Sequence, residues 1–278
     1  MQQAADITRI EQAARTLRCD IVEMLAEAGS GHPGGSLSAA DIVAALYFGV
    51  MDHDPAQPKM PTRDRFILSK GHAAPVLYAA LAEAGYFPRE QLKTLRKLGS
   101  MLQGHPDSNK TPGVEVSTGS LGNGLAIANG IALALRMDDN TTSRVFCLLG
   151  DGELQEGLVW EAAMFAAQQR LENVIAIVDH NGLQIDGPVA EIVAVDPVAE
   201  KFRAFGWEAM NCDGHDVRAV VTALQGASGH HGKPTVIVAD TVKGRGVSFM
   251  EDRCEWHGVA PTAEQAASAI AEIEQMQD

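Results

Sequence analysis

Gly150-Asp151-Gly152 and Asn181-Gly182 follow two apolar runs, 145–149 and 174–178, and thirty positions separate Asp151 from Asn181. Residues 157–169, between the two runs, have the apolar spacing of an amphipathic helix. A strand, a helix and a second parallel strand form a crossover that brings both carboxyl strand ends to one edge of a sheet. Asp151 and Asn181 are therefore expected to face the crevice in which open α/β sheets bind ligands.

An acid and an amide at that edge suit a divalent metal ion. They leave the remaining coordination positions of Mg²⁺ to phosphate oxygens and water, which is how this ion is usually bound. Gly152 would allow close approach of a phosphate, and the helix after it would point its amino end at that phosphate. Asp-Gly or Asn-Gly alone is also explained by a strand-end turn. The two pairs together, with Gly187 after Gln184-Ile185-Asp186, favour a metal–diphosphate site.

The same residues resemble a known family. Gly150-Asp151-Gly152 with Asn181 is similar to the thiamine diphosphate motif, and Glu153-Leu154-Gln155-Glu156-Gly157 with Trp160-Glu161-Ala162 is similar to transketolase in particular. Four more segments resemble transketolase in the same order: Gly31-His32-Pro33-Gly34-Gly35, Ser69-Lys70-Gly71-His72-Ala73, Gly104-His105-Pro106 and Ser117-Thr118-Gly119-Ser120-Leu121-Gly122. The similarity ends near His257-Gly258 and covers only the amino-terminal, diphosphate-binding part of a transketolase. It therefore implies the first subunit of a split transketolase.

The resemblance implies a metal site and a cofactor site. Asp151, Asn181 and the backbone carbonyl of Leu183 would bind Mg²⁺, with Ca²⁺ or Mn²⁺ as alternative ions, and the metal would hold thiamine diphosphate. Gly119 would offer its carbonyl to the aminopyrimidine of the cofactor, and Leu121 would support that ring.

Seven of the nine histidines lie beside glycine, and four of these are in turn-like segments with motif context: His32, His72, His105 and His257. A single such pair usually marks a capped or core histidine, but four are harder to explain by packing, and imidazole suits contacts to phosphates or sugar hydroxyls. From the family, His72 and His257 would contact the diphosphate, and the catalytic residues His32, His105 and His257 would orient the donor hydroxyls. The others are expected to be structural or exposed: His53, His180, His215, His230 and His231.

Two charged residues have two interpretations each. Glu156 would complement a helix dipole from the first turn, or lie at a subunit interface as in the family. Lys243, in the run 243–247, would face a phosphate or belong to a solvated turn after the last strand. Both are candidate cofactor-binding residues.

The function that the resemblance implies is transfer of a two-carbon ketol unit from a ketose phosphate to an aldose phosphate. The pyrimidine-binding and C-terminal domains are expected on a separate chain, a C-terminal transketolase subunit, in a heterotetramer. The pathway stays open between the pentose phosphate route and a specialised one. Three alternatives are an alpha subunit of a 2-oxoacid dehydrogenase, a 1-deoxyxylulose-phosphate synthase and a non-catalytic nucleotide-binding module. The Gly-His segments and Leu154-Gln155-Glu156-Gly157 favour transketolase.

Composition narrows the class of protein. The chain has 278 residues, enough for one large domain, with 36 acidic and 22 basic residues and no basic run. Neither nucleic acid nor an anionic membrane is an expected partner. Four scattered cysteines suit a reducing compartment, and there is no apolar run of about 20 residues, so we expect a cytoplasmic protein.

Periodicity predicts an α/β fold, a parallel β-sheet covered by helices on both faces, in a single domain over residues 1–278. The resemblance implies that this is the diphosphate-binding domain. Strands are predicted at 65–68, 145–149, 174–178, 208–212 and 235–239. Helices are predicted at 7–28, 39–48, 73–84, 121–136, 157–169, 217–227 and 263–275. Residues 52–62 and 100–119 read as loops, and the longer loop is expected to be functional.

Overall fold

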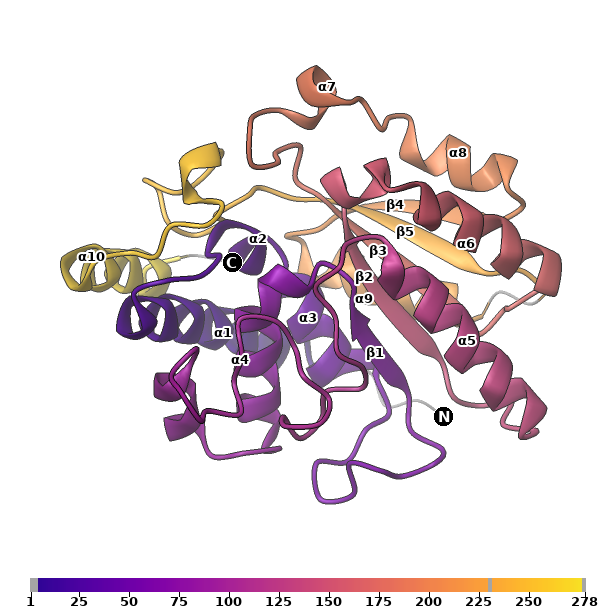
Figure 1. Ribbon diagram of the computed structural model, residues 1–278, viewed down its shortest axis with the longest axis horizontal. Coiled ribbons are helices and arrows are strands. Elements are labelled where there is room, and N and C mark those ends of the chain that lie inside the picture. Colours follow the sequence, from indigo (N-terminus) through magenta and orange to yellow (C-terminus); the bar gives the residue numbers. More distant parts are fainter. Residues whose placement is uncertain (1–4, 230–231, 277–278) are drawn as a thin grey trace.

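The computed structural model describes residues 5–229 and 232–276 (Figure 1). Its centre is a five-stranded sheet in which every neighbouring pair is parallel, in the order β1-β2-β3-β5-β4. The strands are β1 Arg65–Leu68, β2 Val145–Gly150, β3 Val174–His180, β4 Glu208–Asp213 and β5 Thr235–Asp240. All five predicted strands are confirmed, and the last four extend one or two residues further than predicted.

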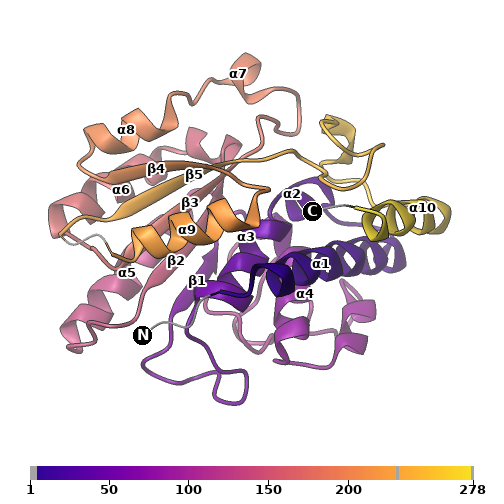
Figure 2. The same ribbon diagram turned by 180° about the vertical axis from the view of Figure 1, so that it is seen from behind.

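Helices cover both faces of this sheet, as predicted (Figures 1 and 2). One layer contains α1 Ile7–Ala28, α2 Gly34–Ser38, α3 Ala40–Ala45, α4 Ala74–Ala84, α9 Val217–Ala227 and α10 Ala263–Glu274. The other contains α5 Asn123–Met137, α6 Gly157–Gln169 and α8 Val198–Ala204, with the single turn α7 Val189–Ile192 beyond them. The remaining helical turns are Leu46–Val50, Gly71–Ala73, Arg89–Thr94, Gly152–Gln155 and Cys254–Trp256.

The alternation of side chains along each strand explains the two layers. On β2, Phe146 and Leu148 pack into the core under α1, α3, α4 and α9, whereas Cys147 and Leu149 pack into the core under α5, α6 and α8. Because successive strand residues point to opposite faces, a strand buried on both sides is apolar at every position. This is why the strands appeared in the sequence as continuous apolar runs.

The helix predictions were right over most of the chain but not at every boundary. The helix predicted at 39–48 is divided into α3 and a π-helical turn, Leu46–Val50. The helix predicted from Leu121 begins at Asn123, because Gly122 adopts a left-handed conformation at its N-cap. The short helices α2, α7 and α8 were not predicted. Residues 52–62 and 100–119 contain no helix or strand, as expected. Over the described part of the chain, no helix is long and apolar enough for a membrane crossing.

Candidate functional site

A cavity of about 450 Å³ opens at the carboxyl ends of β1, β2 and β3. Parallel strands deliver the segments that follow them to one edge of the sheet, which is where such folds bind ligands. Each of the twelve predicted site residues lines this cavity: His32, His72, His105, Gly119, Leu121, Asp151, Gly152, Glu156, Asn181, Leu183, Lys243 and His257. The structure thus brings together residues that lie far apart in the sequence.

Asp151 is a buried carboxylate at the end of β2. One of its oxygens accepts from Gly152 N at 2.7 Å, and the other accepts from Gly182 N at 2.5 Å. The second bond joins Asp151 to the turn that carries Asn181. Burial, helped by the nearby charge of Asp179, raises the pKa of the Asp151 carboxyl to about 6. A cation bound at this carboxylate would remove the electrostatic cost of its ionisation.

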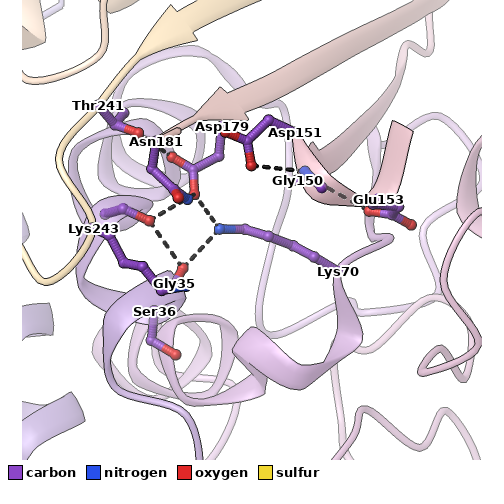
Figure 3. Close-up of polar contacts among 12 residues, drawn as sticks. Gly35, Ser36, Lys70, Gly150, Asp151, Glu153, Asp179, Asn181, Thr241 and Lys243 are labelled. Atoms are coloured by element: carbon purple, nitrogen blue, oxygen red, sulfur yellow. Dashed lines mark hydrogen bonds and ion pairs between the residues drawn. The ribbon is translucent and has the colours of Figure 1, made fainter. Parts of the chain in front are cut away.

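Asn181 follows β3, and its amide is held in one orientation. Its Nδ2 donates to Asp179 Oδ2 at 3.0 Å (Figure 3). Its Oδ1 accepts from Leu183 N at 3.2 Å. Because Asp179 can only accept, the amide nitrogen must face it, which leaves the amide oxygen for the cavity side. Asn181 and Asp151 therefore present one amide oxygen and one carboxylate to the same cavity.

The donor set fits a hard divalent cation. Among residues 5–229 and 232–276, no three His, Cys, Asp or Glu side chains gather in a way that would hold a metal ion. A carboxylate, an amide and a backbone carbonyl are oxygen donors that leave positions for phosphate and water, as Mg²⁺ requires. The carbonyl of Leu183, the predicted third ligand, here accepts from Lys243 Nζ at 3.1 Å.

Asp179 is a buried residue of the site that the sequence analysis missed. It accepts from Ser38 Oγ at 2.6 Å and also from Thr241 Oγ1 and Lys70 Nζ. Burial opposes its ionisation, but the ammonium of Lys70 and the hydrogen bonds from Ser38 and Thr241 together outweigh burial and hold the pKa of Asp179 below its ordinary value. Figure 3 shows this carboxylate between Asn181, Thr241 and Lys70. The ion pair thus fixes the amide that points towards the cavity.

Lys243 supplies a second buried ammonium. It is 1% exposed, so its interpretation as part of a solvated turn is wrong. Its Nζ lies 2.9 Å from His257 Nδ1, and no ion pair with a carboxylate is found for it within the described residues. Burial lowers the pKa of Lys243 to about 8. A buried cation in such surroundings fits a polyanionic ligand.

Three histidines line the same side of the cavity in mutual contact. The ring centroids of His32, His72 and His257 lie 5.2–5.4 Å apart. Burial, with Lys70 nearby, lowers the pKa of His72 to about 2, and burial with Lys243 lowers the pKa of His257 to about 3. Burial also lowers the pKa of His32. These rings are therefore neutral near pH 7, each with one N–H donor and one acceptor nitrogen.

His105 and Gly119 contact each other at another wall of the cavity. Gly119 has φ +143°, and a Cβ there would lie 3.0 Å from His105 Cγ, so the position favours glycine. Burial lowers the pKa of His105, and the guanidinium of Arg96 adds to the effect at both His105 and His32. Arg96 is a second residue that the sequence analysis missed.

Glu153 and Glu156 have different roles after β2. Glu153, also missed, is buried and accepts from Ser69 Oγ, from Gly122 N at 2.8 Å and from Gly150 N at 3.1 Å. It thereby ties the start of α5 to the end of β2. Glu156 lies at the N-cap of α6 rather than in its first turn, and its side chain makes no capping hydrogen bond. A 3-10 turn, Gly152–Gln155, comes before α6, which begins at Gly157 as predicted.

Three of the other histidines lie outside the cavity, as expected. His53 contacts Tyr86 and the carbonyl of Tyr47, and His180 contacts Asp240. His215 lies between Asp41 and the backbone of Val242. Two further histidines, His230 and His231, lie outside the described residues.

Comparison with known proteins shows the family to which the chain belongs. Residues 8–274 match the family described as transketolase, thiamine diphosphate binding domain. The chain belongs to this family, whose cofactor is thiamine diphosphate with a divalent metal ion. Its parallel sheet flanked by helices agrees with a thiamine diphosphate binding domain, and the alternative of a 2-oxoacid dehydrogenase subunit is not favoured.

Some of the similar proteins have about the same length as this chain. It is 45% identical over 265 residues to the 6-deoxy-6-sulfo-D-fructose transketolase subunit SqwG of Clostridium sp. (strain MSTE9), covering 95% of this chain and 96% of the relative. It is 44% identical to an apulose-4-phosphate transketolase subunit of Actinobacillus succinogenes, covering 95% of each.

Other similar proteins are longer. The chain is 44% identical to transketolase of Homo sapiens but covers 42% of it. A solved structure, transketolase from Leishmania mexicana, matches with a TM-score of 0.90 and 34% identity over 96% of this chain and 42% of that one. The chain therefore spans less than half the length of these transketolases.

Proposed function

We propose that this chain is the diphosphate-binding subunit of a two-chain transketolase, which transfers a two-carbon ketol unit from a ketose phosphate to an aldose phosphate. The observation that carries the proposal is the meeting of Asp151, Asn181 and the buried Lys243 in one cavity. Oxygen donors for a cation and a buried ammonium for an anion are what a metal-bound diphosphate needs. The family and the subunit-length relatives support the same activity.

Each group would hold one part of the cofactor. Asp151, Asn181 and the carbonyl of Leu183 would bind Mg²⁺, which requires that this carbonyl be released by Lys243. The released ammonium would then face the diphosphate. The ammonium of Lys243 would therefore exchange a neutral acceptor, the Leu183 carbonyl, for the charged oxygens of the diphosphate. This exchange favours the state with the cofactor bound.

The neutral histidines would do the remaining positioning. His72 and His257 would donate to diphosphate oxygens, and His32 and His105 would orient the hydroxyls of the donor sugar. Neutral imidazoles can donate and accept at the same time, so they can follow the hydroxyl protons of a sugar without adding charge. The cofactor supplies the carbon–carbon bond chemistry when it is bound.

A separate chain would complete the site. The support is that relatives of this length are named as transketolase subunits, whereas transketolases that contain this region within one chain are more than twice as long. Leu121 and Ile185 line the cavity although they are 37% and 66% exposed, and a partner that closes the mouth would cover them. Glu156 also lines the cavity, and we place it at the interface with the partner. We propose a heterotetramer with two shared sites.

For the sugar substrate and the cellular compartment, we propose a general class. The relatives' names include a 6-deoxy-6-sulfo-D-fructose and an apulose-4-phosphate transketolase, so proteins of this similarity act on different sugars. We propose sugar phosphates of the pentose phosphate type as the first substrates to test. The four cysteines are free, which supports a reducing, cytoplasmic setting.

The test is reconstitution. The chain would be purified alone and with the product of a neighbouring reading frame, and ketol transfer would be measured with thiamine diphosphate and Mg²⁺ over a panel of sugar phosphates. Activity that requires both chains and is lost in Asp151→Asn supports the proposal. Robust turnover by this chain alone would refute the two-chain arrangement, and pyruvate decarboxylation by the pair would refute ketol transfer.

A further inference from the structure

A charged network lies outside the cavity, beneath the loop that carries Lys243. Asp41 on α3 is buried, and it accepts from Arg18 of α1 at 3.0 Å and 2.5 Å. Its second oxygen also accepts from His215 Nδ1 at 2.7 Å. The guanidinium of Arg18 lowers the pKa of Asp41 to about 2 against the opposing effect of burial, so the carboxylate is ionised near pH 7. The two helices pack side by side on that face of the sheet (Figure 2).

This network contacts the loop 242–246 at two points. The ring of His215 accepts from Val242 N at 2.8 Å through Nε2, and Arg18 Nε donates to the carbonyl of Arg245 at 3.3 Å. Lys243 lies between these two points, next to Val242. Its side chain leaves in the other direction, where Nζ reaches His257 and the Leu183 carbonyl.

The contacts of His215 fix its tautomer. A backbone N–H can only donate, so Nε2 must be without a proton, and the ring hydrogen must lie on Nδ1, facing Asp41. The ring therefore joins a buried carboxylate to one backbone amide of the loop. A side chain that merely fills space would not need a donor on one side and an acceptor on the other.

We propose that Arg18, Asp41 and His215 form a positioning network that holds the loop 242–246 so that Lys243 enters the cofactor cavity. None of the three residues is among those that line the cavity, so the network acts through the backbone of the loop. Other bonds share the work, since Thr241 N donates to the His180 carbonyl and Gly244 N donates to the Gly34 carbonyl. Loss of the His215 contact is therefore expected to displace Lys243 partly rather than to release it.

The first test needs no cofactor, so its outcome is independent of the proposed function. His215→Leu removes both ring contacts, and His215→Gln keeps an amide donor and an acceptor. His53→Leu is the matched control, because His53 is half-buried, has contacts at both ring nitrogens and lies outside the cavity. Hydrogen exchange at the amides of 242–246 should become about fivefold faster in His215→Leu only, as expected for the loss of one net hydrogen bond.

The second test uses thiamine diphosphate with Mg²⁺ as the probe, on the full chain and on the reconstituted complex. His215→Leu should raise the dissociation constant, and the apparent KM for the cofactor, about fivefold. The kcat at saturating cofactor should be unchanged, and His215→Gln should recover most of the loss. The proposal is overturned if His215→Leu resembles His53→Leu in both exchange and affinity.

If His215→Leu does not fold, ring ¹⁵N spectra of the unaltered chain decide. A proton on Nδ1 and none on Nε2 supports the network, whereas the opposite tautomer would overturn it.

Discussion

The Asp151→Asn substitution should stabilise the cofactor-free chain near pH 8 and abolish its metal-dependent binding. In the folded chain the pKa of this carboxyl is about 6, against an ordinary value of 3.8, mainly because it is buried. The folded state therefore holds the proton more tightly than the unfolded state. The stability that the protonated group contributes is complete below about pH 4 and is lost as the pH rises through 6. The difference between the two pKa values corresponds to about 3 kcal/mol at pH 8.

The amide recovers only part of this amount. Asp151 accepts from Gly152 N and Gly182 N through separate oxygens, and an asparagine has only one oxygen. One buried N–H would lose its acceptor, at a cost of about 1–2 kcal/mol. The net gain in the free energy of unfolding at pH 8 is then about 1–2 kcal/mol. Each kcal/mol raises the unfolding temperature of a chain of this size by roughly 2–4 °C. Below pH 4 the sign reverses, because the aspartate is then neutral and the missing acceptor remains.

Two measurements check this prediction. Thermal unfolding without metal, followed from pH 4 to pH 8, should show the curves of the two chains crossing. Calorimetric titration with thiamine diphosphate and Mg²⁺ should show affinity reduced by more than about 100-fold, since loss of a metal's outer partner alone costs about 10–100-fold. Asp186→Asn, at an exposed carboxylate on the rim of the cavity, is the control and should show neither effect. A variant that binds cofactor normally, or is no more stable at pH 8, would refute the reasoning.

Three further substitutions test other parts of the structure. Lys243→Met removes a buried ammonium, so it should leave thermal stability unchanged or higher while weakening binding of inorganic pyrophosphate by at least about tenfold. Asp20→Asn should make the free energy of unfolding vary less between pH 4 and pH 8, by up to about 3 kcal/mol. The reason is that burial raises the pKa of Asp20 to about 6 despite its 2.7 Å contact with Arg89. An unchanged pH dependence of unfolding would contradict this prediction. Phe202→Ala should cost about 3–5 kcal/mol in denaturant unfolding, because Phe202 is fully buried against Trp207.

The strands and the strand-end residues of the site could be predicted from the sequence because both produce local patterns. A parallel strand buried on two faces is a continuous apolar run, and the turns after such strands carry glycine next to a polar residue. Asp151 and Asn181 could therefore be placed at one edge without any knowledge of distances. The helix α8 has only seven residues, and its buried stripe was too short to produce a period.

The ion pair beneath the site has no local signal. Lys70 and Asp179 lie 109 residues apart in the sequence. Each comes two residues before a candidate site residue, His72 in one case and Asn181 in the other. In sequence, Asp179 reads as the polar end of a strand. Only the fold shows that it is fully buried and that four donors converge on it.

The charge distribution explains how an acidic chain can hold a diphosphate. The net charge of the protein is −14, so its long-range field opposes a polyanion. Within the cavity, Asp179 neutralises Lys70, and the buried histidines add no charge. The other charged groups that line the cavity are the carboxyl groups of Asp151, Glu153, Glu156 and Asp186 and the ammonium of Lys243. Acidic groups outnumber basic ones there, so a divalent cation is needed to offset the field that the diphosphate meets. Binding of the diphosphate should consequently depend steeply on Mg²⁺, and measurable affinity for pyrophosphate in the presence of a chelator would contradict this account.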